Sequence, residues 1–195
     1  MDLRSSEVEQ YSNLMSESQY MVAADTLASV NIPKVCRWLD VGGGKGTFVG
    51  ELNKSYPKVD AAVFDLPGSH SANAKHNCII GSFKEDELPK GYDIISLIRI
   101  LYDHRDQTIE NLLAKAHAAL SKGGRLIVSE PMLGPDEPTL WGDVYFAMYT
   151  LAMSTGKTRS PEQISEFIKA AGFMDVKIHK AKRPFITTVI EARRI

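Results

Sequence analysis

Cysteine is scarce in this chain, with only Cys36 and Cys78 among 195 residues. Both lie in apolar, strand-like stretches and have no partner at metal-ligand spacing, which argues against a zinc site or a disulfide framework. We interpret them as reduced core residues of a cytoplasmic protein. The histidines His70, His76, His117 and His179 show no metal spacing either. We therefore expect no bound metal.

Net charge and long apolar runs are also lacking. The formal net charge is −1, so nothing in the composition indicates nucleic acid or an anionic membrane surface as a partner. No apolar run reaches membrane-spanning length, and the polar first 13 residues predict neither a signal peptide nor an integral membrane segment. With 44% hydrophobic and 24% charged residues and no internal repeats, the chain is typical of one soluble globular domain.

The most informative stretch runs from Trp38 to Gly46, a buried-strand pattern that ends in a glycine turn with Asp40 just before it. Gly42, Gly44 and Gly46 let the backbone approach a ligand without obstruction by a Cβ atom. The dinucleotide pattern requires a third glycine where Thr47 stands, so that pattern fails. The spacing matches D-x-G-x-G-x-G, the glycine loop of class I S-adenosylmethionine-dependent methyltransferases, which the sequence resembles here.

A second acid supports a cofactor site. Asp65 ends another apolar run 19 residues after Gly46 and is followed by Leu66 and Pro67. In nucleotide-binding βαβ units, an acid about 20 residues beyond the glycines binds the ribose hydroxyls. The alternative is that Asp65 only caps the turn before Pro67. Two motifs at the right separation favour the cofactor interpretation.

Apolar strand-like runs alternate with helical patterns along the chain, which predicts an α/β fold with a mainly parallel sheet and helices on both faces. After a helical lead-in over residues 1–30, we expect five strands, at Arg37–Val41, Asp60–Asp65, Asn77–Gly81, Tyr92–Ile98 and Arg125–Glu130, and then a terminal hairpin of Met174–His179 and Pro184–Glu191. Pro57 should stop the first crossover helix, and Gly123 and Gly124 the helix before the fifth strand. Ser160 to Gln163 forms a capping box with proline at the first helical position.

The segment from Pro138 to Thr155 is apolar almost all round. A helix of that kind is buried or meets a partner. We expect part of it to lie in the core, and the rest to line a substrate pocket or a homodimer interface.

Nearly the whole chain resembles the catalytic domain of plant-type and bacterial small-molecule O-methyltransferases, and within that group the bacterial carotenoid (hydroxyneurosporene and demethylspheroidene) enzymes. The residues that carry the resemblance are Leu39–Gly44, Phe64–Pro67, Ile95–His104, Ser129–Met132 and Arg159–Ser160. It implies a Rossmann-like, seven-stranded methyltransferase fold over residues 31–195, S-adenosylmethionine as cofactor, and an apolar small-molecule acceptor. The family's N-terminal dimerisation domain is expected to be absent.

By position, the resemblance implies that Gly42 and Gly44 lie against the methionine part of the cofactor and that Asp65 holds the ribose. Ser82 and Phe83 match two residues that lie at the adenine in the family. The resemblance implies that Phe83 stacks on the base, whereas Ser82 replaces the usual acid. Arg99 stands where many members have a basic residue near the cofactor; the alternative is a salt bridge at a strand end.

The catalytic positions depart from the family pattern. The usual histidine base falls at Tyr102, Asp103 matches the acid that follows it, and His104 replaces a tryptophan. Glu130 keeps one of two flanking carboxylates. A phenol with a pKa near 10 is a poor base, whereas His104, with a reference pKa near 6.5, is the better-poised one if it faces the pocket. We therefore take Tyr102, Asp103, His104 and Glu130 as the candidate catalytic residues.

Three alternatives to an O-methyltransferase remain open at this point. A C-methyltransferase that acts on a tetrapyrrole would use the same scaffold. A non-catalytic cofactor-binding module would bind without transfer. A nicotinamide oxidoreductase is disfavoured by Thr47.

Overall fold

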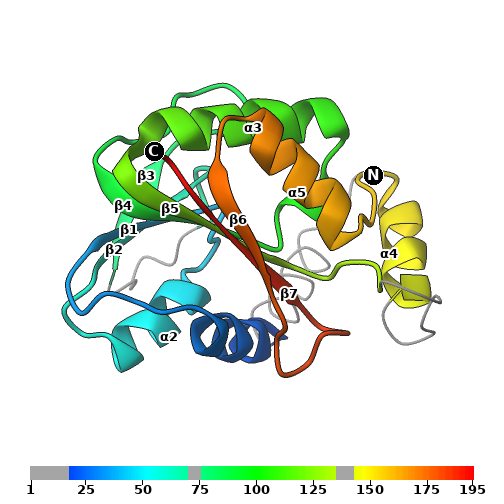
Figure 1. Cartoon of the computed structure of the whole chain (residues 1–195), viewed down its shortest axis with the longest axis horizontal. Helices are drawn as coiled ribbons and strands as arrows, with labels where there is room; N and C mark the ends of the chain where they lie inside the picture. The colour runs from blue at the N-terminus through cyan, green and yellow to red at the C-terminus, as the bar shows by residue number, and fades with distance from the viewer. Residues whose placement is uncertain (1–17, 70–75, 135–142) are drawn as a thin grey trace.

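The computed structural model describes residues 18–69, 76–134 and 143–195. Its centre is a seven-stranded sheet in the order β3-β2-β1-β4-β5-β7-β6 (Figure 1). The strands are β1 (Arg37–Val41), β2 (Asp60–Asp65), β3 (Asn77–Ile80), β4 (Tyr92–Ile98), β5 (Leu120–Glu130), β6 (Met174–His179) and β7 (Thr188–Arg193). The first five strands are parallel, and β7 runs antiparallel to both β5 and β6. The predicted α/β class and sheet are confirmed.

Helices cover both faces of the sheet (Figure 1). Helices α3 (Asp106–Ala119) and α5 (Pro161–Ala170) pack on one face, over a core cluster that includes Leu39, Leu97 and Leu113. Helix α2 (Thr47–Ser55) and the helix of residues 18–29 cover the other face. The burial of apolar side chains on both faces explains why the central strands are apolar runs rather than alternating patterns.

Several local expectations are confirmed. Helix α2 ends at Ser55, just before Pro57. Helix α5 begins with the predicted capping box, in which the Ser160 hydroxyl accepts from the Gln163 amide and the Gln163 side chain accepts from the Ser160 amide. Gly172 follows that helix with a φ of 95°, a left-handed conformation that glycine adopts without strain. Local capping chemistry therefore determined these boundaries.

Several boundaries differ from the prediction: β3 ends at Ile80, β5 begins at Leu120, and β7 ends at Arg193. Helix α3 ends at Ala119, not at Gly123, because Leu120 already pairs with Tyr92 as the first residue of β5. The next pair along is Ile94 with Arg125, so the glycines lie in an irregular part of the strand. The last strand begins at Thr188 rather than Pro184, since proline has no N–H to donate to the ladder.

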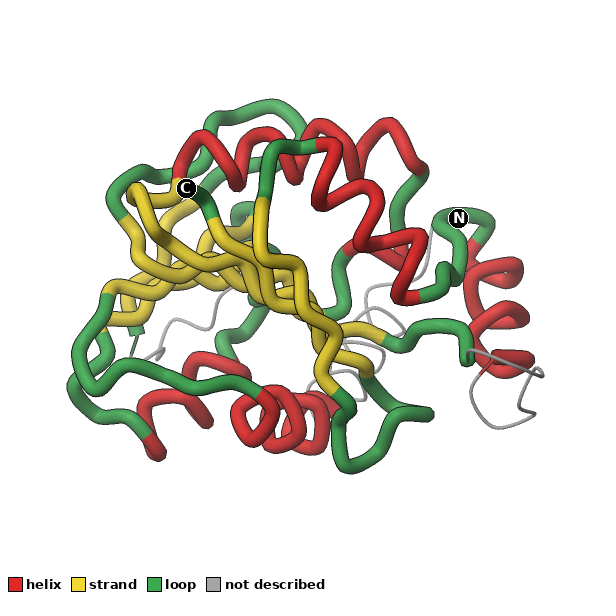
Figure 2. Tube along the Cα trace, in the orientation of Figure 1, coloured by secondary structure: helices red, strands yellow, loops and turns green. Residues whose placement is uncertain are grey.

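The apolar segment forms helix α4 (Tyr145–Met153), which lies beyond the carboxyl end of β5 and away from the sheet (Figure 2). Its expected start at Pro138 lies outside the described residues. The side chains of α4 differ in burial: Phe146 and Tyr149 are partly buried against Tyr102, as expected, whereas Tyr145, Met148 and Leu151 are 60%, 60% and 71% exposed. A uniformly apolar pattern predicts a contact for a helix but does not say which surface provides it.

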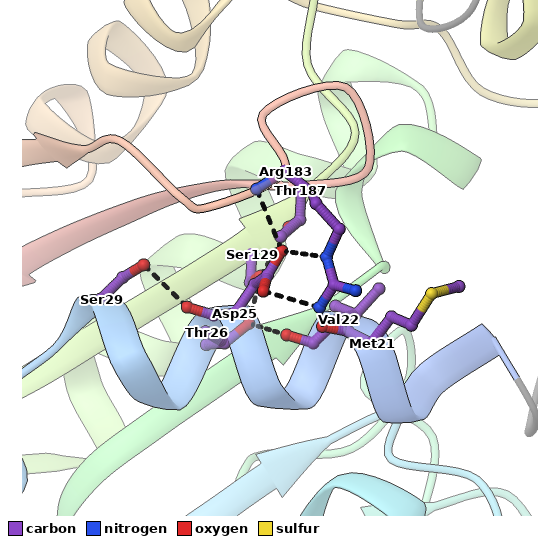
Figure 3. Close-up of polar contacts among 8 residues, drawn as sticks. All are labelled: Met21, Val22, Asp25, Thr26, Ser29, Ser129, Arg183 and Thr187. Carbon is purple, nitrogen blue, oxygen red and sulfur yellow. Dashed lines mark hydrogen bonds and ion pairs between the residues drawn. The ribbon is translucent and has the colours of Figure 1, made fainter.

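The helix of residues 18–29 is joined to the sheet by polar contacts as well as by apolar packing (Figure 3). The buried hydroxyls of Thr26, Ser129 and Thr187 form a chain of hydrogen bonds, 2.6 and 2.7 Å long. The Asp25 carboxylate accepts from the Arg183 guanidinium at 2.8 and 2.9 Å. These contacts tie the helix to β5 and to the β6–β7 connection. Within the described residues, no helix is long and apolar enough to cross a membrane.

Candidate active site

A cavity of about 390 Å³ opens at the carboxyl edge of the sheet, between the ends of β1 and β4. These strands are neighbours, and the chain order runs outward from them in both directions. Open α/β sheets bind ligands at such a switch point, because the loops that follow the two strands diverge. The cavity is lined by Gln19, Gly42, Gly43, Gly44, Lys45, Thr47, Gly68, Ser69, Ile98, Arg99, Ile100, Tyr102 and Asp103. Its volume falls in the range of small-molecule sites.

The glycine loop after β1 needs glycine for two different reasons. Gly42, Gly44 and Gly46 have φ values of 72°, 55° and 76°, which side chains rarely adopt. A Cβ atom on Gly42 would lie 2.3 Å from Ile100 Cδ1, whereas one on Gly44 would meet no atom within 4 Å. Gly42 is thus required by packing. Gly44 keeps the backbone bare where it faces the cavity.

Two carboxylates support this loop from below. Asp65 Oδ2 accepts from the Gly44 amide at 2.7 Å, and Asp65 Oδ1 accepts from the Leu66 amide at 2.6 Å. Asp40 is fully buried, and its Oδ1 accepts from the Ser96 hydroxyl at 2.6 Å. Burial raises the pKa of Asp40 to about 7, assisted by the nearby charge of Asp65, while the Ser96 hydrogen bond opposes the rise. Both acids thus shape the loop, and neither is among the residues that line the cavity.

Arg99 lies in the cavity wall at the end of β4, with an unusual φ of 60° for a non-glycine residue. Its guanidinium donates to the Ser18 hydroxyl at 2.8 Å and, more weakly, to Gln19 Oε1 at 3.4 Å. The N-terminal end of the helix of residues 18–29 therefore closes one side of the cavity.

The segment after β4 carries two of the predicted catalytic residues, Tyr102 and Asp103, on a short 3-10 helix, η1 (Leu101–Asp103). Glu130, at the end of β5, is fully buried and uses one oxygen for the Leu101 amide and the other for the Tyr102 amide, at 2.8 and 2.7 Å. Burial raises the pKa of Glu130 to about 8, while these two hydrogen bonds oppose the rise. The carboxyl group of Glu130 therefore accepts from the η1 backbone, and Glu130 is not among the residues that line the cavity.

Asp103 lines the cavity together with Tyr102. Burial raises the pKa of Asp103 to about 6, and the Arg99 charge opposes that shift. Its Oδ1 is buried and has no hydrogen-bond partner in the part of the chain that the structure describes. A carboxyl group of this kind changes its charge close to neutral pH, inside the cavity.

His104 faces another direction. Its ring contacts Phe83 edge-on, with ring centroids 5.3 Å apart, and it is not among the cavity-lining residues. Burial lowers the pKa of His104 to about 4, assisted by the positive charges of Lys84 and Arg159. His104 therefore does not meet the condition set for it as a base: it does not line the cavity, and partial burial and two nearby cations lower its pKa from the reference value of 6.5. At neutral pH His104 is uncharged.

The segment expected at the adenine is held by its own contacts. The Ser82 amide donates to Asp86 Oδ2 at 2.8 Å. Lys115 of α3 donates to the carbonyls of Phe83, Lys84 and Asp86. Phe83 is partly buried against the core and lies near Gly42. The edge of the Phe83 ring therefore lies close to the glycine loop.

Tyr102 is only 3% exposed and lies against aromatic side chains of α4. Its ring centroid is 5.8 Å from that of Tyr149 and 6.2 Å from that of Phe146. The cavity wall at Tyr102 therefore continues into aromatic side chains of α4. These can pack against a largely apolar molecule whose polar group lies near the Tyr102 hydroxyl.

The structure brings part of the predicted site together. Gly42, Gly44, Arg99, Tyr102 and Asp103 line one cavity. The predicted residues outside its lining are Asp40, Gly46, Asp65, Leu66, Ser82, Phe83, His104 and Glu130. The lining residues that were not predicted as site residues are Gln19, Gly43, Lys45, Thr47, Gly68, Ser69, Ile98 and Ile100. Ser69 follows Asp65 closely enough to have been included, whereas Gln19 reaches the cavity only because its helix crosses the sheet.

Among known sequences, the chain is similar to two proteins named demethylspheroidene O-methyltransferase. The chain is 50% identical over 190 residues to demethylspheroidene O-methyltransferase of Rhodobacter capsulatus, which covers 95% of this chain and 48% of that protein. It is 41% identical over 194 residues to the enzyme of the same name from Cereibacter sphaeroides, covering 94% and 51%. The chain thus spans about half the length of the curated relatives it matches.

Comparison with solved structures supports the same relationship. Human N-acetylserotonin methyltransferase, solved in complex with SAM, superposes with a TM-score of 0.85 at 26% identity, covering 95% of this chain and 55% of that one. The O-methyltransferase domain family matches residues 2–174. On the strength of that match and of the 50% identical relative, the chain belongs to the O-methyltransferase domain family.

Proposed function

We propose that this protein transfers a methyl group from S-adenosylmethionine to a hydroxyl group of an apolar small molecule. The observation that carries the proposal is the convergence of the glycine loop and of the Arg99–Asp103 segment on one cavity at the switch point of the sheet. The identity to O-methyltransferases over 95% of the chain favours this chemistry over a nicotinamide oxidoreductase.

The residues present fit the cofactor. Gly44 leaves bare backbone toward the cavity, and Asp65 retains acceptor capacity because each carboxylate oxygen has two lone pairs. Phe83 offers an aromatic face for the adenine, and Arg99 a positive charge for the carboxylate of the methionine part. In this proposal Gly42 and Gly44 lie against the methionine part, and Asp65 binds the ribose.

The bound cofactor supplies an electrophilic methyl group on a sulfonium. The protein's own task is to place a hydroxyl group in line with it and to accept that group's proton. Tyr102 and Asp103 are the polar groups in the cavity wall next to the aromatic surface of α4. We assign Tyr102 to orient the acceptor hydroxyl and Asp103 to take up the proton, since its pKa of about 6 leaves it ionised at neutral pH.

For the acceptor, we infer a hydroxylated carotenoid or a similar long conjugated molecule. The relatives at 50% and 41% identity are named demethylspheroidene O-methyltransferases. The ring cluster of Tyr102, Phe146 and Tyr149 is suited to the flat, apolar surface of a polyene. We also propose that the protein is cytoplasmic. We propose further that it forms a homodimer through the exposed apolar side of α4. Light scattering of the purified protein would measure this association.

The decisive experiment has two stages. Calorimetric titration with S-adenosylmethionine and with S-adenosylhomocysteine should show one site for each, and Gly44→Ala should weaken both. Methyl transfer to a hydroxylated carotenoid presented in detergent micelles is then measured with radiolabelled donor. A product methylated at oxygen supports the proposal. A product methylated at carbon would favour the tetrapyrrole-type alternative, binding without transfer would favour a non-catalytic module, and absence of cofactor binding would overturn the proposal.

A further inference from the structure

The backbone of η1 is held from its amide side by the buried carboxyl group of Glu130 and from its carbonyl side by a buried arginine. Arg159, just before α5, is only 2% exposed. Its Nη2 donates to the His104 carbonyl at 2.9 Å, and its Nη1 donates to the Leu101 carbonyl at 3.3 Å. The two carbonyls are those that flank Tyr102 and Asp103.

The segment that precedes Arg159 adds a third contact on the carbonyl side of η1. Arg159 Nη1 also donates to the Lys157 carbonyl at 2.9 Å, and the Lys157 amide donates to the Tyr102 carbonyl at 2.9 Å. A Cβ atom on Gly156 would lie 2.0 Å from that Tyr102 carbonyl. Gly156 and Lys157 thus lie directly against the backbone of Tyr102, and Arg159 donates both to this segment and to the Leu101 and His104 carbonyls.

A simple ion pair does not account for this arrangement. The acidic partner, Asp106, is 52% exposed, and ion pairs open to water contribute little to stability. The guanidinium presents rigid, planar donors, and three of its bonds go to backbone carbonyls on both sides of Tyr102. A buried, always charged fork of this kind constrains where those carbonyls lie, because leaving its donors unpaired is costly.

We propose that Arg159 is a positioning residue for the reaction: it holds the Leu101–His104 backbone so that the Tyr102 side chain keeps its place in the cavity wall. It touches neither the cavity nor an assigned cofactor residue, and it acts through the backbone alone. The inference rests on the proposed role of Tyr102 at the acceptor hydroxyl. A small displacement of an orienting group can lower a rate about a hundredfold.

The first test does not need activity. Amide hydrogen exchange of the whole chain is compared between the unsubstituted protein and Arg159→Lys, which keeps the charge but not the fork. Amides of residues 101–104 should exchange about tenfold faster, with the strands unchanged. Arg125→Lys is the matched control, because Arg125 is another largely buried arginine, paired with Glu191 at the opposite edge of the sheet. Unchanged exchange at 101–104 would overturn the inference.

The second test measures coupling to Tyr102. Arg159→Lys should lower kcat about tenfold or more while the KM for S-adenosylmethionine changes less than about threefold. In a Tyr102→Phe background the same substitution should lower kcat less than about threefold, since there is no phenol left to position. Equal losses in both backgrounds would mean a merely structural role. If Arg159→Lys does not fold, Asp106→Asn, which loosens the guanidinium, should give a smaller change of the same kind.

The two proposals fail separately. If no methyl acceptor is found but amide exchange at residues 101–104 responds to Arg159→Lys, the proposed function is wrong. The finding that Arg159 holds the 101–104 backbone would still stand. If transfer is measured and neither exchange nor coupling changes, only the positioning role is wrong.

Discussion

The hydroxyl oxygens of Thr26 and Ser129 lie 2.6 Å apart, although 103 residues separate them in the sequence. Both side chains are fully buried, and Ser129 also bonds to the Thr187 hydroxyl (Figure 3). Ser129 precedes Glu130, and its carbonyl accepts from the Arg99 amide at 2.9 Å. The contact therefore connects the helix of residues 18–29 to the strand end from which the candidate active site is built.

Removing the Thr26 hydroxyl should destabilise the fold. Thr26→Val keeps the shape of the side chain but leaves Ser129 with one hydroxyl partner fewer in a buried position. We expect a loss of about 1–3 kcal/mol in the free energy of unfolding, measured by urea denaturation. Ser29→Ala on the same helix removes only a half-buried local bond to the Asp25 carbonyl and should cost less. Equal costs would contradict a special role for the hydroxyl chain.

The Asp25–Arg183 pair should make stability depend on acid pH. Hydrogen bonds from Arg183 hold the pKa of Asp25 below its ordinary value, against the effect of burial. A lowered pKa contributes stability that is complete above the ordinary carboxyl pKa and is lost as pH falls through the lowered one. The advantage of the unsubstituted protein over Asp25→Asn should therefore shrink between about pH 5 and pH 2.

Denaturation midpoints across that pH range measure the effect. Asp60→Asn serves as the control, because the Arg37–Asp60 pair is 3.5 Å long and exposed on both sides. Such a pair contributes little at any pH. An advantage over Asp25→Asn that stays constant down to the most acidic point would argue against the pair as its source.

Gly44→Ala should separate cofactor binding from folding. The new methyl group meets no atom within 4 Å and points to where the proposed cofactor lies. We expect S-adenosylhomocysteine to bind about tenfold more weakly by calorimetry, a loss of about 1.4 kcal/mol. Gly123→Ala is a matched control, with a φ of 80° and equally open space, in the irregular start of β5. Both variants carry the same left-handed strain, so only Gly44→Ala should lose affinity.

Tyr102→Phe should lower kcat more than His104→Ala does. Tyr102 lines the cavity, whereas His104 packs on Phe83 and its pKa is lowered to about 4. Removal of an orienting or proton-handling group costs about a hundredfold, and we expect less than about threefold for His104→Ala. Tyr145→Phe, at a residue that is 60% exposed on α4, controls for the loss of a phenol. The reverse order of effects would return the base to His104.

The rate should depend on the ionisation of Asp103. Its pKa is raised to about 6, so the group is protonated below that pH and a carboxylate above it. If the carboxylate takes up the proton of the acceptor, kcat/KM should rise with pH through about 6 and then level off. Asp103→Asn should be slower throughout and lack that step. A step near pH 6 that survives in Asp103→Asn would assign it to another group.

The fold and the cofactor loop followed from local chemistry. Residues close together in the sequence determine three of its features: the apolar strands, the turn with glycines at 42, 44 and 46, and the capping box at Ser160. The sheet order then places the segments after β1 and β4 side by side, which parallel strands with helical crossovers require. A single sequence was therefore enough for the class and the sheet, and it named the two segments that meet at the cavity.

Tertiary structure alone decided how the site residues act. It turned Glu130 toward two backbone amides, buried His104 beside cations so that its pKa fell, and brought Gln19 to the cavity. It also decided which side of α4 is covered: Phe146 and Tyr149 lie against Tyr102, and Met148 and Leu151 are exposed. Desolvation, charge proximity and hydrogen-bond direction depend on residues that are distant in the chain. The sequence could therefore identify candidate site residues but not the role of each one.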